Sequence, residues 1–208
     1  AAWLGSTGLG TPGAQNSRHA ADPAPVIRSV AHTPPMPRSQ DAVTITAMVI
    51  DDRTVSSVRV FSRVDGTTTF TQAMMFDDGA HGDGPAGDGT YGATLVKRAN
   101  GTIVHFYVEA ADNTAHVRKL HANAPTTVCL YQVDDRSYPF GLPLYRAILR
   151  DADREDLETR GVDSDVLLDG TFVRGKEVFY NVGLRYRGDN SRDFAVKAFR
   201  IDFPHDQP

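Results

Sequence analysis

The chain has 208 residues, 40% of them hydrophobic, and its formal net charge is -4 because 26 acidic residues outnumber 22 basic ones. A chain of this length can form one large or two small domains with hydrophobic cores. The acidic balance argues against a nucleic-acid partner, since such partners favour strongly basic surfaces. No run approaches the ~18 apolar residues that a membrane span needs, so we expect no membrane span.

Residues 1–24 are rich in Gly, Ala and Pro and lack apolar periodicity, which predicts a linker or the end of a preceding module. The fragment WLGSTGLGTPGAQN, residues 3–16, resembles the end of a lamin-tail-like domain. Domains of that family occur in large bacterial surface proteins, so the resemblance implies an extracellular or cell-surface location.

Residues 25–133 show repeated strand signals separated by turns, with no helical run between them. Within Ala42–Asp51, for example, Val43, Ile45, Ala47 and Val49 fall on one face of the predicted strand, and Thr44, Thr46 and Met48 fall on the other. Seven short strands in about 110 residues predict an immunoglobulin-like or fibronectin-type β-sandwich. The predicted strands are Val26–His32, Ala42–Asp51, Val55–Val64, Thr68–Phe76, Thr90–Lys97, Thr102–Asp112 and Thr126–Val133.

The sandwich has one cysteine, Cys129, in the apolar run VCLYQV, which predicts a buried and inert thiol. Residues 25–133 contain neither a cysteine pair nor a tryptophan. The antibody type of core, which is built on both, is therefore excluded.

An acidic, glycine-rich loop, residues 77–91, joins two predicted strands of the sandwich. Its carboxylates and carbonyls are the ligands that calcium prefers, although the spacing does not fit an EF-hand. Asp-Gly pairs are equally typical of turns in which Asp side chains cap backbone N–H groups, and both interpretations stay open. The loop resembles one that joins strands in Ig-like modules of exported bacterial proteins. The candidate calcium ligands are Asp77, Asp78, Asp83 and Asp88.

Beyond Val133 the signals change to a mixture of helix and strand, which predicts a second domain over residues 138–208. Asp151–Arg160 has acids in its first turns and predicts a helix with Asp151 as its cap. Val166–Val173 and Lys176–Arg187 predict two strands.

The stretch Asn181–Phe203 predicts a β-hairpin, with turn residues from Gly188 to Ser191 between two alternating runs. Cationic groups surround this turn in an otherwise acidic chain and could bind a phosphate through backbone N–H groups and a lysine. An ordinary solvated face explains the same pattern. The cationic residues are Arg185, Arg187, Arg192, Lys197 and Arg200.

The run GTFVRGKEVFYNVGLRYRGDNSRDFAVKAFRIDF, residues 170–203, resembles the opening of the spore-coat CotH-type kinase family. The resemblance implies the N-terminal lobe of an α+β, atypical protein kinase fold. It further implies transfer of phosphate from ATP, with a divalent metal, to a protein substrate. Asp189 departs from the family's pattern, which has Asn there. The residues that the resemblance implies bind ATP are Arg187, Gly188, Asn190, Ser191, Arg192 and Lys197.

Phosphoryl transfer also needs metal-holding and base-positioning acids, which kinase-like folds supply after the lysine strand. The eleven residues after Lys197 cannot contain that lobe, so we expect this piece to be inactive by itself and assign no catalytic residue. The alternative is a non-enzymatic surface or adhesion module in which the acidic loop holds calcium.

Overall fold

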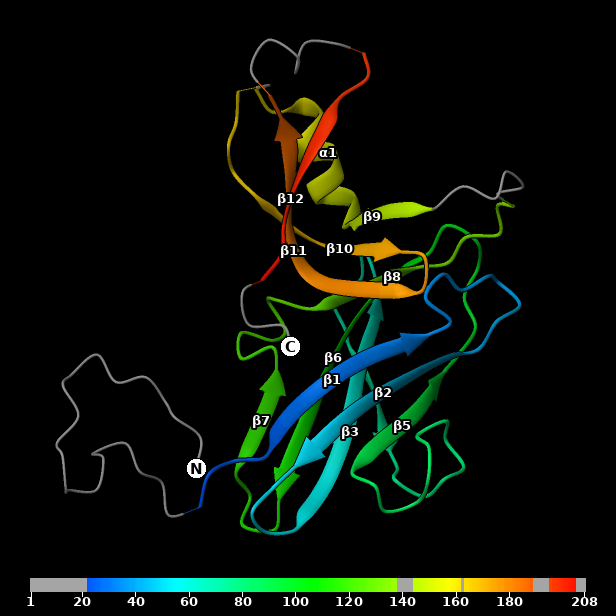
Figure 1. The fold of residues 1–208 in the computed structure, drawn as a ribbon, viewed down its shortest axis with the longest axis vertical. Helices are drawn as coiled ribbons and strands as arrows, with labels where there is room; N and C mark the ends of the chain where they lie inside the picture. The colour runs from blue at the N-terminus through cyan, green and yellow to red at the C-terminus, as the bar shows by residue number, and fades with distance from the viewer. Residues whose placement is uncertain (1–21, 138–143, 162, 189–194, 205–208) are drawn as a thin grey trace, which may run out of the picture.

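The strands form three antiparallel sheets, two of which pack together while the third lies at one end of the long axis (Figure 1). The computed structural model describes residues 22–137, 144–161, 163–188 and 195–204. The described chain is therefore mainly β, as the strand signals predict.

The first sheet has the order β1-β2-β5, and the second has the order β4-β3-β6-β7. In the second sheet β7 and β8 pair with successive stretches of the same edge of β6. The bounds are β1 Val26–Thr33, β2 Val43–Ile50, β3 Val55–Val64, β4 Thr71–Met75, β5 Thr90–Leu95, β6 Ile103–Asp112, β7 Val117–Leu120 and β8 Cys129–Gln132.

The sandwich core forms because one face of each strand is apolar. In β2, residues Val43, Ile45, Ala47 and Val49 are buried while the residues between them are more exposed, as the alternation predicts. They share a core cluster with Phe106 and other residues of the second sheet. The predicted β-sandwich is therefore confirmed in outline.

Strand β6 differs from the expected one-sided pattern, because its first six residues are all buried. Phe106 faces the sandwich core, whereas Tyr107 belongs to a second cluster that includes Ile148 and Val173 of the third sheet. The third sheet thus covers the face of β6 that a free sandwich would expose.

The third sheet has the order β12-β11-β10-β9, and the helix α1 connects β9 to β10. Leu157 of α1 is buried against Val182 and Leu184 of β11, in a third apolar cluster. The bounds are β9 Tyr145–Leu149, α1 Asp151–Thr159, β10 Leu168–Arg174, β11 Glu177–Arg187 and β12 Ala198–Asp202.

Two details of the predicted elements are wrong. The predicted seven strands leave out β7, which has only four residues, two of them basic, and so gives a weak alternation signal. Asp151 does not cap α1: the cap residue is Arg150, which makes no side-chain cap bond. Instead, the backbone N–H of Asp151 donates to Asp65 Oδ2 at 2.7 Å, so a carboxylate of the sandwich satisfies the start of the helix.

The segment that connects the sandwich to the third sheet is held by a buried ion pair. Asp134 is 8% exposed and accepts hydrogen bonds from Arg136 and from the guanidinium of Arg146 on β9. Asp135 accepts from the Ser39 hydroxyl at 2.7 Å.

Among the described residues, no helix has the length and apolar character required to cross a membrane.

Candidate functional site

The predicted hairpin is formed by β11 and β12, which pair from Gly183 opposite Asp202 to Arg187 opposite Ala198. The predicted turn therefore begins after Arg187, the last residue of β11, and Lys197 directly precedes β12. Arg187 and Lys197 thus stand on the two sides of this turn.

The two cations lie on different faces of the sheet. Side chains alternate along a strand, so Arg187 shares a face with Arg185 and Arg200. The Lys197 ammonium lies 5.2 Å from the centroid of the Tyr186 ring, on the face that carries the apolar cluster next to α1. The lysine is half-buried, while Arg187 is exposed.

Arg185 and Arg200 have acidic partners among the described residues. Arg185 forms an ion pair with Asp165 at 2.7 Å, and Arg200 Nε lies 2.8 Å from Asp202 Oδ1. Arg185 and Arg200 are directly opposite each other, where like charges repel, and the two carboxylates offset that repulsion. The cationic cluster predicted from the sequence is therefore partly neutralised.

Gly188 follows β11 with φ 111°, a conformation that favours glycine because it has no Cβ. The remaining predicted phosphate-binding residues of the turn lie outside the described residues. These are Asn190, Ser191 and Arg192.

In the acidic loop, Asp83 is buried and accepts three backbone N–H groups. The backbone N–H groups of Asp78 and Gly79 donate to Asp83 Oδ2, and that of His81 donates to Asp83 Oδ1, each at 2.8 Å. The N–H group of Gly79 contributes most to lowering the pKa of Asp83. This carboxylate organises the first half of the loop.

The other three aspartates of the loop also accept N–H groups. Asp77 accepts from Gly87, Asp88 and Gly89, and Asp88 accepts from Thr90. Asp78 accepts from the backbone of Ala80 and faces His81 Nδ1 at 2.8 Å, a contact that lowers the pKa of Asp78.

The structure does not gather these four carboxylates around one point. Among the described residues, one group of three or more His, Cys, Asp or Glu side chains has all its ligand atoms within 4.8 Å, namely Asp22, Asp112 and His116. The hydrogen bonds of the loop are those of aspartates that cap a turn. Calcium binding by Asp77, Asp78, Asp83 and Asp88 stays a prediction.

A buried polar pair lies between the sandwich and the third sheet, and no sequence pattern predicts it. His32 of β1 and Tyr180 of β11 are hydrogen-bonded at 2.5 Å. The carbonyl of Pro35, 3.1 Å from His32 Nε2, can only accept, so Nε2 carries the proton and Nδ1 accepts from the Tyr180 hydroxyl. Burial lowers the pKa of His32 to about 4. Neither residue type is diagnostic, and the partners are 148 positions apart.

A cleft of about 860 Å³ lies next to this pair, between β1 and β11. It is lined by apolar side chains such as Ile27 and Val178, and by Cys129 and Asn181. Cys129 is 1% exposed, so its predicted burial is confirmed, and burial raises the pKa of its thiol, which disfavours the reactive thiolate. Of the predicted phosphate and calcium ligands that the structure describes, none lines this cleft.

Residues 33–115 match the family model described as the second Ig-like domain of conditioned medium factor. The match runs from the end of β1 to the β6–β7 turn and covers less than half of the chain. Together with the arrangement of the sheets, it supports an Ig-like fold for the sandwich. No curated protein matches the chain. The resemblances to a lamin-tail-like domain and to CotH-type kinases fall outside the matched residues and stay predictions.

Proposed function

We propose that residues 138–208 form the phosphate-binding strands of a CotH-type, kinase-like domain in an exported multidomain protein. Lys197 and the turn from Arg187 to Arg192 bind the phosphates of ATP, together with a divalent metal. The full protein transfers a phosphoryl group to protein side chains, and the acids that this reaction requires come from another part of it.

The observation that carries the proposal is that Arg187 and Lys197 lie at the two ends of the connection between β11 and β12, in which Gly188 begins the predicted turn. Backbone N–H groups of such a turn can approach a phosphate closely, and a lysine can neutralise it as a point charge. Arg185 and Arg200 are paired with acids and contribute less.

The contact between Lys197 and Tyr186 means that the lysine approaches the phosphates from the face opposite Arg187. The aromatic ring restricts the ammonium to the apolar side of the sheet, next to the cluster that packs on α1. A cation that is already oriented loses less side-chain entropy when it binds a phosphate. Tyr186 is therefore a positioning residue for Lys197.

The Ig-like sandwich has a positional role in this proposal. Its β6 shares an apolar cluster with β9 and β10, and Asp134 bonds to Arg146 across the junction. These contacts support a fixed orientation of the kinase-like part relative to the module that precedes it.

The proposal is tested by titrating the full protein with a fluorescent ATP analogue in the presence of Mg²⁺. Lys197→Ala should weaken binding at least ~10-fold, because a hydrogen bond to a charged group contributes about 1.5–3 kcal/mol. Lys176→Ala, which removes an exposed lysine at the other end of β11, is the matched control. Equal affinity of the Lys197→Ala variant and the wild type would remove Lys197 from the site. Absence of any nucleotide binding would favour the non-enzymatic surface module.

A further inference from the structure

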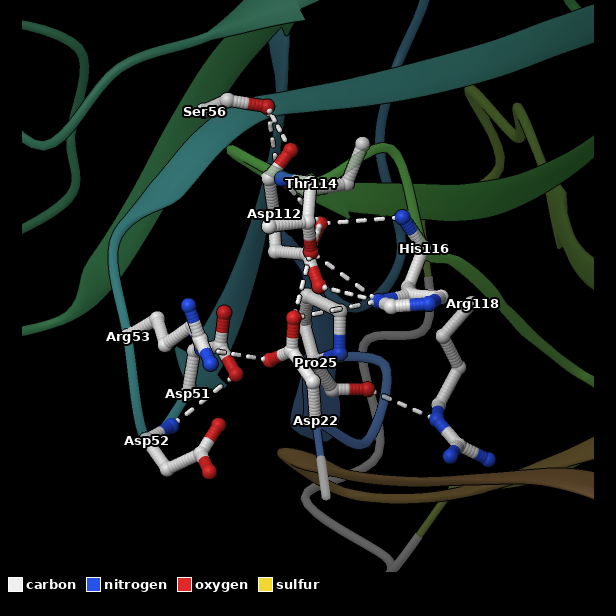
Figure 2. A network of polar contacts seen from close by, with 11 residues as sticks. Asp22, Pro25, Asp51, Asp52, Arg53, Ser56, Asp112, Thr114, His116 and Arg118 are labelled. Atoms are coloured by element: carbon white, nitrogen blue, oxygen red, sulfur yellow. Dashed lines mark hydrogen bonds and ion pairs between the residues drawn. The ribbon is translucent and has the colours of Figure 1, made fainter. Parts of the chain in front are cut away.

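A polar cluster lies where the chain approaches the sandwich (Figure 2). Asp22 precedes β1, Asp112 ends β6, and His116 lies in the turn before β7. His116 Nδ1 is 3.0 Å from Asp112 Oδ2 and 3.6 Å from Asp22 Oδ2. Three segments that are far apart in the sequence thus bring two carboxylates and one imidazole together.

Asp112 is a buried anion that the turn holds in a fixed orientation. Its Oδ1 accepts the backbone N–H groups of Thr114 and His116 at 2.8 and 2.9 Å. Hydrogen bonds from these N–H groups and from the hydroxyl of Thr114 favour the ionised form of the carboxyl group. The second oxygen, Oδ2, faces the imidazole.

The cluster has more negative than positive charge. Arg53 Nε lies 2.8 Å from Asp22 Oδ1, and Arg53 is the cation that pairs with this carboxylate in the described structure. Asp51 lies in the same network, and its Oδ2 is buried without a hydrogen-bond partner among the described residues. A buried carboxylate oxygen without a donor is costly, so this acidic region has little positive charge to balance it.

We propose that Asp22, Asp112 and His116 bind a divalent transition-metal ion of the Zn²⁺ or Mn²⁺ type. Ligands at about 2.1 Å from such an ion lie roughly 3–3.5 Å apart, which is close to the two separations from His116 Nδ1. Imidazole nitrogen is a ligand for transition metals, whereas calcium requires six to eight oxygens.

Metal binding requires His116 to carry its proton on Nε2, so that the Nδ1 lone pair is directed at the ion. The hydroxyl of Thr114 lies 2.7 Å from Asp22 Oδ2 and 2.9 Å from Asp112 Oδ1, and its one proton can be donated to either carboxylate, which keeps these two ligands close together. The ion would fasten the segment before β1 to the β6–β7 turn and so stabilise the folded module.

The test is isothermal titration calorimetry of the 208-residue protein with Zn²⁺ and with Mn²⁺, together with its melting temperature in each ion and in chelator. We expect one ion to bind and to raise the melting temperature. Asp22→Asn and His116→Gln should each weaken binding at least ~10-fold, since even ligand-supporting residues contribute 10–100-fold. His81→Gln is the matched control, because His81 pairs with Asp78 in a two-residue contact of the same kind.

Failure of both ions to bind, or the same affinity in Asp22→Asn and His116→Gln as in the wild type, would overturn the proposal. Equal weakening by His81→Gln would also overturn it, because that result would place the ion in the acidic loop. Asp112 is not substituted, because its carboxylate also holds the β6–β7 turn. A variant at this position could fail to bind the ion simply because the turn has unfolded.

Discussion

His32 is the residue whose environment differs most from what its type suggests. It lies in an exposed-looking strand segment, VIRSVAH, yet it is 2% exposed and stacks on Tyr131 with ring centroids 5.2 Å apart. Sequence reasoning predicted the burial of Cys129 because its neighbours are apolar. It could not predict the burial of His32, because the partner that satisfies the imidazole comes from a distant strand.

The stability of the protein should therefore depend on pH through His32. The folded-state pKa is lowered from 6.5 to about 4, so the unfolded chain binds a proton first as the pH falls. The contribution of His32 to the free energy of unfolding is fully present above pH 6.5. It decreases by up to about 3 kcal/mol between pH 6.5 and about 4. His105, whose pKa is also lowered mainly by burial, adds to the decrease.

Urea unfolding across this range measures the effect, with His32→Gln as the comparison. The variant should lose less stability than the wild type as the pH falls. An identical pH dependence in the two proteins would show that His32 is not the titrating group.

At the level of elements, alternation along the chain predicts the strands well where one face is buried, as in β2. The same reasoning fails for β6, since its second face is covered by residues from another part of the chain, and for β7, which is too short to show a pattern. In the candidate site, the β11–β12 hairpin could be predicted from its turn residues. The ion pairs of Arg185 and Arg200 could not, because they depend on side-chain positions.

The acidic loop packs tightly on β5, and Gly92 is the point of closest approach. A Cβ at Gly92 would lie 2.5 Å from the carbonyl oxygen of His81, a backbone atom that cannot easily move. We expect Gly92→Ala to lower the free energy of unfolding by about 1–3 kcal/mol, a typical cost of overpacking. Gly161→Ala, where a Cβ meets nothing within 4 Å, should change it by less than about 0.5 kcal/mol. Denaturant unfolding of both variants checks this, and equal stabilities would show that the loop is free to shift.

For the whole molecule, the central structural fact is that the sandwich and the third sheet share apolar clusters. Tyr180 of β11 belongs to the sandwich core, while Ile148 and Val173 pack with Tyr107 of β6. The composition shift near Val133 predicts a change of structure type but gives no information on packing between the parts. That packing depends on the faces by which the two parts contact each other, and a local sequence pattern does not predict those faces.

The shared clusters predict that the two parts unfold together. Val173 is fully buried, so Val173→Ala should remove about 1–3 kcal/mol from the whole transition and not from the third sheet alone. Native-state hydrogen exchange of amides in β6 and in β10 measures this, since residues in one cooperative unit share one opening free energy. If protection decreases in β10 while β6 is unchanged, the two parts are independent domains.

The phosphate-binding role of Lys197 is tested most directly by an ATP analogue with a reactive acyl-phosphate group, which acylates lysines next to the bound phosphates. The full protein is labelled with and without excess ATP, and the modified lysines are mapped by mass spectrometry. We predict that Lys197 is acylated and that ATP protects it, whereas exposed Lys176 reacts equally in both samples. Labelling of Lys197 that excess ATP does not reduce would contradict the proposed function.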